Sequence, residues 1–433
     1  MEESKAFKII EALCQNGCKS YLTGGVVRDL FLGKEPNDYD VVTEATSDQV
    51  VNFFPNASTV GKAFEVCIVD GIEVAGYRKD VNFDIGHKNC DVTPAMSLEE
   101  DLARRDLTIN AMAFCPYTNE LIDPYGGRQD LEDGIIRFVG EPRKRIEEDP
   151  CRILRACRFY ALLDGEFDPY TFISMKFNWS LYKQNIAPER IRTEIFKAMK
   201  IPKASKFFEA LQYIGALQDI LPPLADCYGF PGGKYHSETV FEHCMVVGDS
   251  VSTRCPITKL SGYLHDVGKP LFVRKDSSFK EHEDLELVEL EDLRFSTDEI
   301  KKVEELIRLH MFSPAEAKGK GIRRFLGKLR NITYRDFLRL KFADYTGNMR
   351  RGSLSFSEKK KIINKFESEI LREDGVTNGV NSLAINGHDI MSLFDLRPGP
   401  EVGAYLNYLY EIVLENPELN IRDSLMKILT ERE

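Results

Sequence analysis

The sequence predicts an α+β protein in which a small head with a mixed sheet precedes a long all-α part. Segments rich in β-branched and aromatic residues, typical of strands, occur in the first 140 residues, as at 39–42, 64–69 and 72–77. From about residue 143 onward the apolar residues follow a helical spacing. A Pro-Gly cluster at 230–234 predicts a junction within this helical part.

The smaller elements of the head follow from local patterns. We expect a helix, a strand and a helix at 6–16, 20–22 and 26–31. Residues 79–97 are polar and lack periodicity, which predicts a mobile loop. A second hairpin is expected between 111 and 139, containing the turn Asp123–Gly127.

Length and composition indicate a multidomain protein with reduced thiols. A chain of 433 residues holds roughly two to four domains. It has no apolar run of about 18 residues and begins with the charged segment Met1–Lys5, so we expect neither a membrane span nor a signal peptide. Ten cysteines without C-x-x-C pairs predict buried thiols in a cytoplasmic protein, not a zinc or disulfide framework.

The charge is unevenly distributed. A net charge of −11 argues against a globally basic nucleic-acid-binding protein. However, 141–206 carries 14 Lys/Arg against 9 Asp/Glu, and 301–351 carries 14 against 5. These stretches could form a basic track for a phosphate backbone; the alternative is solvated helix faces.

The most informative segment of the head joins a glycine turn to two carboxylates. At Gly24 and Gly25, a backbone without side chains can approach a phosphate. Asp38 and Asp40 stand at i and i+2 of an extended segment, so both point to one side and can share a divalent cation. The combination favours metal-assisted phosphoryl or nucleotidyl transfer. The alternative is a surface turn followed by a solvated strand end.

A second segment, Arg104–Met112, combines two arginines with an acid and an amide. Guanidinium groups match phosphate oxygens, and Asn110 with the neighbouring Asp106 can hold a ribose hydroxyl. The alternative is a helix end with ordinary surface charges.

Six segments occur in one order: GGVVRD, DYD, RRDLTINAM, DPYGG, EEDPCRILRACRF and APERIRTE. Together they resemble the class II nucleotidyltransferases, the group of the bacterial-type CCA-adding tRNA nucleotidyltransferases and their poly(A) polymerase relatives. The resemblance covers residues 21–196 and implies a nucleotidyltransferase head followed by a helical neck.

The resemblance implies roles for residues of the head. Asp38 and Asp40 match the carboxylates that hold two Mg²⁺ ions, which activate the RNA 3′-hydroxyl and steady the pyrophosphate. Glu73 matches a third acidic position, and Asp123–Gly127 a hinge between head and neck. The matched nucleotide-binding positions are the triphosphate-facing Gly24, Gly25 and Arg28, and the ribose-sensing Arg105, Asp106 and Asn110.

In the neck, Asp149 and Arg152 match the pair that presents a Watson–Crick-like edge to cytosine and then to adenine. From the residues alone, an i,i+3 helix salt bridge between them is the alternative. The last neck motif, Glu189–Arg192, supports the pocket in the family. Arg155 and Arg192 are assigned to nucleotide binding.

The loop expected at 79–97 has about the length seen in CCA-adding members, where it is implicated in the change from C to A addition. Its sequence is His87-Lys88-Asn89-Cys90 where the family usually has Arg-Arg-Pro. A poly(A)-type or partial specificity therefore stays open.

A second chemistry is indicated in the all-α part, where imidazoles and carboxylates recur in order. They are His243, His265, Asp266, His282, His310 and Asp344. Such a set can hold a divalent transition metal, whose bound water attacks phosphate. The segment GYLHDVGK resembles the HD phosphohydrolase signature, which implies a site for Ni, Mn, Fe or Co and a 2′,3′-cyclic phosphate, 2′-phosphate or nucleotide substrate. A non-catalytic scaffold is the alternative. His87, His236 and His388 are assigned no role.

The sequence predicts a charged helix followed by a polar turn within 353–381, and a final helical segment at 385–429. Residues 385–403, with Asn420, resemble the C-terminus of HD-containing CCA enzymes. A basic run predicts tRNA backbone contact at Arg323, Arg324, Lys328 and Arg330. The expected domains are a nucleotidyltransferase head, a helical neck, an HD-type body and a helical tail at 1–140, 141–225, 226–350 and 351–433.

The resemblance implies a CCA-adding enzyme that transfers C, C and A from CTP and ATP to tRNA, with possible phosphohydrolase activity at the HD site. Alternatives within the family are a poly(A) polymerase or a partial CC- or A-adding enzyme. An alternative of another class is a non-catalytic RNA-binding protein.

Overall fold

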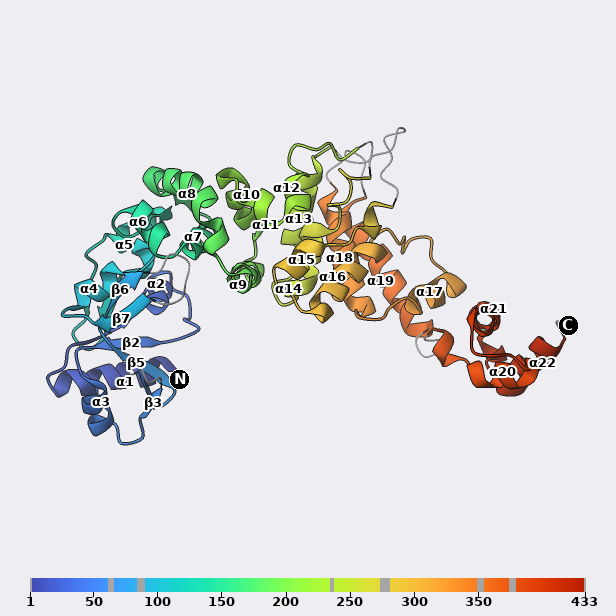
Figure 1. Ribbon diagram of the computed structural model, residues 1–433, viewed down its shortest axis with the longest axis horizontal. Helices are drawn as coiled ribbons and strands as arrows, with labels where there is room; N and C mark the ends of the chain where they lie inside the picture. The colour runs from blue at the N-terminus through green and yellow to red at the C-terminus, as the bar shows by residue number, and fades with distance from the viewer. Residues whose placement is uncertain are drawn as a thin grey trace. The chain divides into compact units, whose positions relative to one another are not determined.

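The computed structural model describes residues 2–60, 66–83, 90–233, 237–272, 281–348, 354–373 and 379–431 (Figure 1). Two compact units, 1–220 and 221–433, divide the chain. The four-domain division expected from the sequence stays a prediction.

A seven-stranded mixed sheet, ordered β3-β4-β5-β2-β1-β8-β9, organises the first unit. The strands are β1 (Ser20–Thr23), β2 (Asp40–Thr43), β3 (Ser58–Val60), β4 (Val66–Val69), β5 (Ile72–Gly76), β8 (Ala113–Cys115) and β9 (Glu120–Ile122). β2 and β5 run parallel and the other neighbours antiparallel. The predicted mixed sheet of the head is therefore confirmed.

The prediction of an unstructured loop at 79–97 was wrong. β6 (Arg78–Phe83) and β7 (Cys90–Pro94) pair antiparallel as a separate two-stranded sheet, and α4 (Leu98–Ala103) begins soon after. Because these strands pair only with each other in the described residues, they need no continuous apolar face and leave no strong strand pattern. His87, Lys88 and Asn89 lie outside the described residues.

The second predicted hairpin is real but shorter than expected. β8 and β9 are joined at 116–119, and the Asp123–Gly127 turn follows the hairpin instead of closing it. The Asp123 carboxylate accepts hydrogen bonds from the backbone N–H groups of Gly127 and Arg128, at 2.7 and 2.9 Å, and so begins a helix. A Cβ at Gly127 would lie 2.1 Å from the carbonyl oxygen of Thr108, so only glycine fits there.

Helices account for most of the rest of this unit. They are α1 (Glu2–Gln15), α2 (Gly25–Phe31), α3 (Ser47–Phe53), α5 (Gly127–Asp133), α6 (Pro142–Glu148), α7 (Cys151–Leu163), α8 (Pro169–Tyr182), α9 (Pro188–Met199), α10 (Ser205–Ile214) and α11 (Leu217–Ile220). Two short strands, β10 (Ile135–Ile136) and β11 (Glu166–Phe167), pair in parallel.

The second unit is helical throughout its described residues, as predicted. Its helices are α12 (Pro222–Ala225), α13 (Val240–Ser250), α14 (Pro256–Leu264), α15 (Val288–Asp292), α16 (Thr297–Leu309), α17 (Gly319–Leu326), α18 (Tyr334–Gly347), α19 (Phe356–Glu373), α20 (Gly387–Phe394), α21 (Pro400–Glu415) and α22 (Arg422–Thr430). Phe325, Phe337 and Phe366 form one buried cluster, and α20–α22 bury a separate one. No helix in the described part of the chain is both long and apolar enough to cross a membrane.

Candidate functional site

The first unit contains an open cavity of about 410 Å³ with a strongly cationic lining. Six arginines, three aspartates, two glycines, an asparagine and a phenylalanine line it: Gly24, Gly25, Arg28, Asp40, Arg104, Arg105, Asp106, Asn110, Asp149, Arg152, Arg155, Phe159 and Arg190. Arginine is suited to phosphate because its forked donors match two oxygens at once. The excess of guanidinium groups over carboxylates fits a polyanion.

The glycine turn brings backbone close to these guanidinium groups. Gly24 has φ +78°, a conformation that favours glycine. A Cβ there would lie 2.8 Å from a terminal nitrogen of Arg105. The backbone conformation therefore favours glycine on this wall of the cavity, although the end of the flexible Arg105 side chain could shift to admit a Cβ.

A chain of hydrogen bonds joins four of the residues that line the cavity. Arg28 donates to the Asn110 side-chain oxygen at 2.7 Å, and the Asn110 amide donates to Asp106 at 3.1 Å. Arg155 donates to the other Asp106 oxygen at 2.6 Å. Although burial opposes ionisation, Arg155 and the hydrogen bond from Asn110 hold the pKa of Asp106 well below its usual range. These four residues are thus held in fixed positions by one another.

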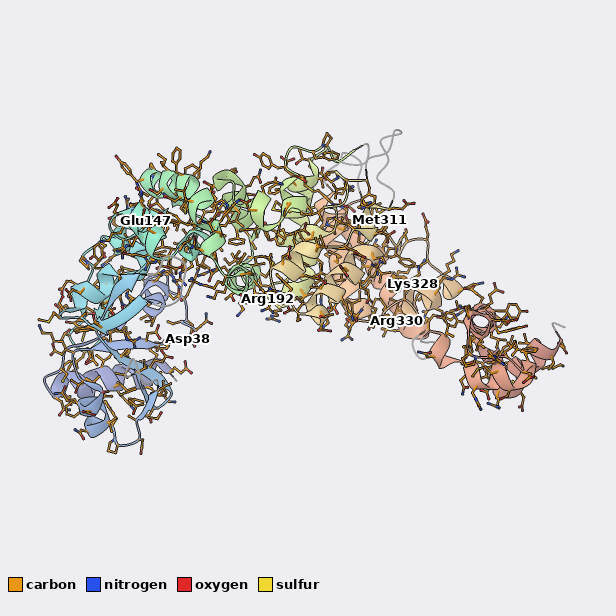
Figure 2. All side chains as sticks on the ribbon, viewed as in Figure 1. Asp38, Glu147, Arg192, Met311, Lys328 and Arg330 are labelled. Atoms are coloured by element: carbon orange, nitrogen blue, oxygen red, sulfur yellow. The ribbon has the colours of Figure 1, made fainter. Side chains whose placement is uncertain are left out.

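The predicted metal carboxylates lie at the start of β2, the central strand of the sheet. Asp38 is exposed (Figure 2). Asp40 is partly exposed and Tyr39 between them is buried, so the alternation expected of an extended segment is present. Asp40 lines the cavity and stands opposite Glu73 in the parallel register of β2 and β5; Asp38 does not line the cavity. Burial and the charges of Glu73 and Asp38 raise the pKa of Asp40, while Arg105 opposes this.

This all-oxygen donor set fits a hard cation such as Mg²⁺. Mutually repelling carboxylates that share one side of a strand pair are stabilised when a cation neutralises them. Their oxygens do not, however, form a cluster of three within 4.8 Å; the described clusters of that kind lie in the second unit.

Asp149 and Arg152 do not bind each other. Asp149 accepts two hydrogen bonds from Arg190, at 2.8 and 2.7 Å. Arg152 is 8% exposed and donates to Glu148 at 2.7 Å and to the carbonyl oxygen of Arg104 at 2.9 Å. The ordinary salt bridge between these two residues is absent from the described ion pairs, and both side chains line the cavity.

The structure places Arg190, not Arg192, at the cavity. Arg192 lies two residues further along α9, with its guanidinium carbon 4.9 Å from the centre of the Phe196 ring, and it does not line the cavity (Figure 2). Helical periodicity could have separated them, because residues two apart face different sides of a helix. Arg104 and Phe159 also line the cavity and were not among the predicted site residues.

The second unit gathers the predicted histidines and aspartates at one buried centre. His243 lies in the first turn of α13, which begins with a reciprocal cap between Thr239 and Glu242. α14 packs closely on α13 because Gly248 has no side chain: a Cβ there would lie 2.2 Å from the Tyr263 ring. Since α14 ends just before His265, this contact brings the two histidines together.

The remaining members come from other helices of this unit. His282 belongs to a short 3₁₀ turn, His310 follows the end of α16, and Asp344 lies in α18. Nε2 of His282 and Nε2 of His310 lie 3.1 and 3.4 Å from one oxygen of Asp266. The His243 and His265 Nε2 atoms lie 3.7 and 3.4 Å from the other oxygen.

Every histidine of the centre faces an acceptor with its other ring nitrogen. Nδ1 of His265 is 2.9 Å from the Gly262 carbonyl oxygen, and Nδ1 of His310 is 2.6 Å from that of Ile307. The equivalent atoms of the other two lie 3.4 and 3.3 Å from carboxylate oxygens: His243 from Glu238, and His282 from Glu283. An acceptor at the outer nitrogen leaves Nε2 available for a metal.

These residues fit a divalent transition metal. Three ligand atoms lie within 4.8 Å of one another in each of two sets: His243, His265 and Asp344; and His265, Asp266 and His310. Nε2 of His265 is buried and has no hydrogen-bond partner. Although burial opposes ionisation, the pKa of Asp266 lies well below its usual value because of His265 and Lys269, so this carboxylate is ionised and able to ligate.

The basic run proposed for tRNA contact is partly structural. Arg323 is 8% exposed and donates to the Leu414 carbonyl oxygen at 2.7 Å and to Glu373 at 2.6 Å. Arg324 pairs with Glu411. The buried Arg323 guanidinium therefore joins α17 to neighbouring helices, which corrects its assignment to RNA. The exposed cations of the run are Arg324, Lys328 and Arg330, and their contact with RNA stays a prediction (Figure 2 labels Lys328 and Arg330).

Three family models match successive parts of the chain. A poly(A) polymerase head domain matches residues 20–137, a probable RNA and SrmB-binding site of polymerase A matches 167–228, and an HD domain matches 234–349.

Relatives of several named activities match this chain. Poly(A) polymerase I of Haemophilus influenzae is 33% identical over 51% of this chain and 52% of its own length. The CCA-adding enzyme of Geobacillus stearothermophilus is 37% identical over 51% and 55%. The chain spans about half the length of most such curated relatives. The A-adding tRNA nucleotidyltransferase of Deinococcus radiodurans is 31% identical over 90% of both chains.

The fold agrees with a solved structure over nearly its full length. The Bacillus stearothermophilus CCA-adding enzyme in complex with CTP superposes with a TM-score of 0.69, at 25% identity, over 99% of this chain and 97% of that one. With the Deinococcus match, these similarities show that the chain belongs to the class II nucleotidyltransferase family of CCA-adding, A-adding and poly(A)-adding enzymes.

Proposed function

We propose that this protein is a tRNA nucleotidyltransferase that adds C, C and A from CTP and ATP to the tRNA 3′ end. The observation that carries the proposal is the cavity, whose lining combines six arginines with the carboxylate of Asp40. Transfer of a nucleotidyl group from a triphosphate requires a positively charged site for the phosphates next to carboxylates that can bind a metal ion.

Each part of the cavity has a distinct task in this proposal. Arg28 binds the triphosphate beside the glycine turn, and the Asp106–Asn110 pair holds the ribose. We reassign Arg105 from the ribose to the triphosphate, because its terminal nitrogen lies beside Gly24 of that turn. Asp38 and Asp40 would hold Mg²⁺, which supplies charge neutralisation and activation of the 3′-hydroxyl when bound.

Base choice is assigned to Asp149 and Arg152. One accepts and the other donates hydrogen bonds, so together they can match the edge of cytosine or adenine. A base that leaves buried polar groups unpaired is rejected, because each such group costs about 1–3 kcal/mol.

A purely A-adding activity is the second candidate for the head. It is favoured by the Deinococcus match, which extends over 90% of both chains and carries that name. A poly(A) polymerase is the third, since enzymes so named match half of the chain.

One assay separates these candidates. Purified protein is given tRNA transcripts ending before the CCA, after C and after CC, with CTP, ATP or both. Completion of all three ends supports the CCA-adding proposal. Extension of the CC-ended transcript alone identifies an A-adding enzyme, and a long adenosine ladder a poly(A) polymerase. No incorporation with any transcript supports a non-catalytic RNA-binding protein.

We further propose that the second unit is a metal-dependent phosphohydrolase acting on 2′,3′-cyclic phosphate, 2′-phosphate or a nucleotide. Two overlapping ligand sets and an unsatisfied buried Nε2 on His265 support this. Hydrolysis is measured with Ni²⁺, Mn²⁺, Fe²⁺ and Co²⁺, as opening of the 2′,3′-cyclic phosphate to a phosphomonoester and as release of inorganic phosphate from the 2′-phosphate and the nucleotide. Metal binding without hydrolysis of any of the three would leave a scaffold role.

A further inference from the structure

A buried carboxylate just outside the cavity binds two of the arginines that line it and one neighbouring strand. Asp101, in α4, is 0% exposed. One of its oxygens accepts from the backbone N–H of Arg78 and from Nε of Arg104, both at 3.1 Å. The other accepts from a terminal nitrogen of Arg105 at 3.0 Å. The first contact is to strand β6, and the two arginines line the cavity.

The segment that follows Asp101 is in contact with both the phosphate side and the base side of the cavity. Arg105 packs against Gly24 of the glycine turn. Arg152, of the base-reading pair, donates to the backbone carbonyl oxygen of Arg104 at 2.9 Å. Asp101 therefore acts on Arg104 and Arg105 through their side chains, but on Arg152 only through the backbone.

The electrostatics require such a group. Six guanidinium groups around one cavity repel one another, and two of them belong to consecutive residues. A carboxylate that is buried and hydrogen-bonded holds its partners more firmly than an exposed one, because it is not screened by water. Without it, the side chains of Arg104 and Arg105 would lose a buried anion that holds them beside the cavity.

We propose that Asp101 is a positioning residue of the nucleotide site, which orients Arg104 and Arg105 toward the triphosphate and ties strand β6 to them. This inference rests on the proposed nucleotidyl transfer. Since CTP and ATP carry the same triphosphate, loss of the Asp101 charge weakens binding of both by the same factor. Base choice stays unchanged, because the contact from Arg152 is to backbone.

The test compares D101N with a matched control, D168N. Asp168 is also buried, also pairs with an arginine (Arg137, at 2.6 Å) and also accepts from a backbone N–H (Thr171, at 3.0 Å), but its arginine partner does not line the cavity. Values of KM and kcat are measured for CTP and for ATP on transcripts of the appropriate end. We expect D101N to raise both KM values about ten- to hundredfold, as loss of a charge-assisted hydrogen bond does, with kcat within about twofold. D168N should leave both KM values unchanged.

Two further variants make the result specific. In an R105A background D101N should add less than it does alone, because part of its effect passes through Arg105. D101E, which keeps the charge one methylene away, should give intermediate KM values, and it replaces D101N in the comparison if far-UV circular dichroism shows that D101N does not fold.

Several outcomes would overturn the inference: a fall in kcat at constant KM, a change confined to one nucleotide, full additivity with R105A, or the same loss in D168N. If the wild-type protein incorporates no nucleotide, the proposed function fails. The comparison is then made on CTP and ATP affinity by calorimetry, where equal affinities for wild type and D101N, or no binding at all, refute the role of Asp101.

Discussion

Asp40 of β2 and Glu73 of β5 stand opposite each other across a parallel strand pair, and the charge of Glu73 adds to burial in raising the pKa of Asp40. The repulsion between the two carboxylates destabilises the folded protein at the edge of the cationic cavity. A bound cation would relieve it, which makes this pair the place to test the metal assignment.

We expect D40N to lower nucleotide incorporation at least about a thousandfold, because it removes charge where the transition state needs it. E73Q should have a smaller effect, since Glu73 acts mainly through Asp40. Single-turnover incorporation into a labelled tRNA transcript is the measurement. D48N is the control, because Asp48 is an exposed residue in the first turn of α3. Activity of D40N within tenfold of D48N would remove Asp40 from the chemistry.

R190Q and R192Q separate two arginines of one helix. R190Q removes the two hydrogen bonds that Arg190 donates to Asp149 and leaves the one from the Cys151 backbone N–H, so misincorporation of UTP or GTP should rise about tenfold or more. R192Q should change fidelity by less than twofold, because Arg192 does not line the cavity. Competition assays with mixed nucleotides provide the ratio. A larger loss in R192Q would restore the nucleotide-binding role predicted for it from the sequence.

Metal binding in the second unit should depend on His265. We expect H265A to lose tight binding of Mn²⁺, Co²⁺ or Ni²⁺, measured by dialysis and elemental analysis, while tRNA extension in Mg²⁺ stays within twofold of wild type. H388A is the control because His388 is exposed on α20. Equal metal content in H265A and H388A would contradict the assigned centre.

Acid should remove the contribution of Asp106 to stability. Its pKa is depressed in the folded protein, so its contribution is present above the unfolded-state value of about 3.9 and is lost as the pH falls below that. At pH 7, D106N should lower the free energy of unfolding by about 3–5 kcal/mol, as breaking a buried ion pair does. Below about pH 4 the difference between D106N and wild type should shrink.

The single tryptophan makes this measurable. Trp179 is 4% exposed and lies in the first unit, so its fluorescence in urea reports unfolding of that unit. A difference between D106N and wild type that does not change with pH would contradict the depressed pKa.

Much of the site could be predicted because its residues lie in compact segments. Gly24, Asp40 and Asn110 each belong to a local motif, and strand pairing brings those motifs together. The histidine centre could be predicted from the sequence for another reason: few residue types besides histidine and aspartate ligate metals in such an ordered series.

What the sequence did not show depends on partners distant along the chain. The sequence of 78–94 carries no regular apolar alternation to mark the β6–β7 hairpin. Arg323 cannot be distinguished from an RNA-binding arginine until Leu414 and Glu373 are seen beside it. The choice between Arg190 and Arg192 needed the direction in which α9 presents each side chain to the cavity. Composition and spacing carry no information on these contacts.

The two residues assigned to base reading are already hydrogen-bonded to the protein: Asp149 to Arg190, and Arg152 to Glu148. An incoming base must therefore exchange places with a protein partner instead of displacing only water. Such an exchange gives little net affinity, since bonds are broken as others form, but it penalises any base that breaks the internal pair without replacing it. The internal partners Arg190 and Glu148 thus compete with every nucleotide base for these two side chains, so selectivity is obtained at the expense of tight binding.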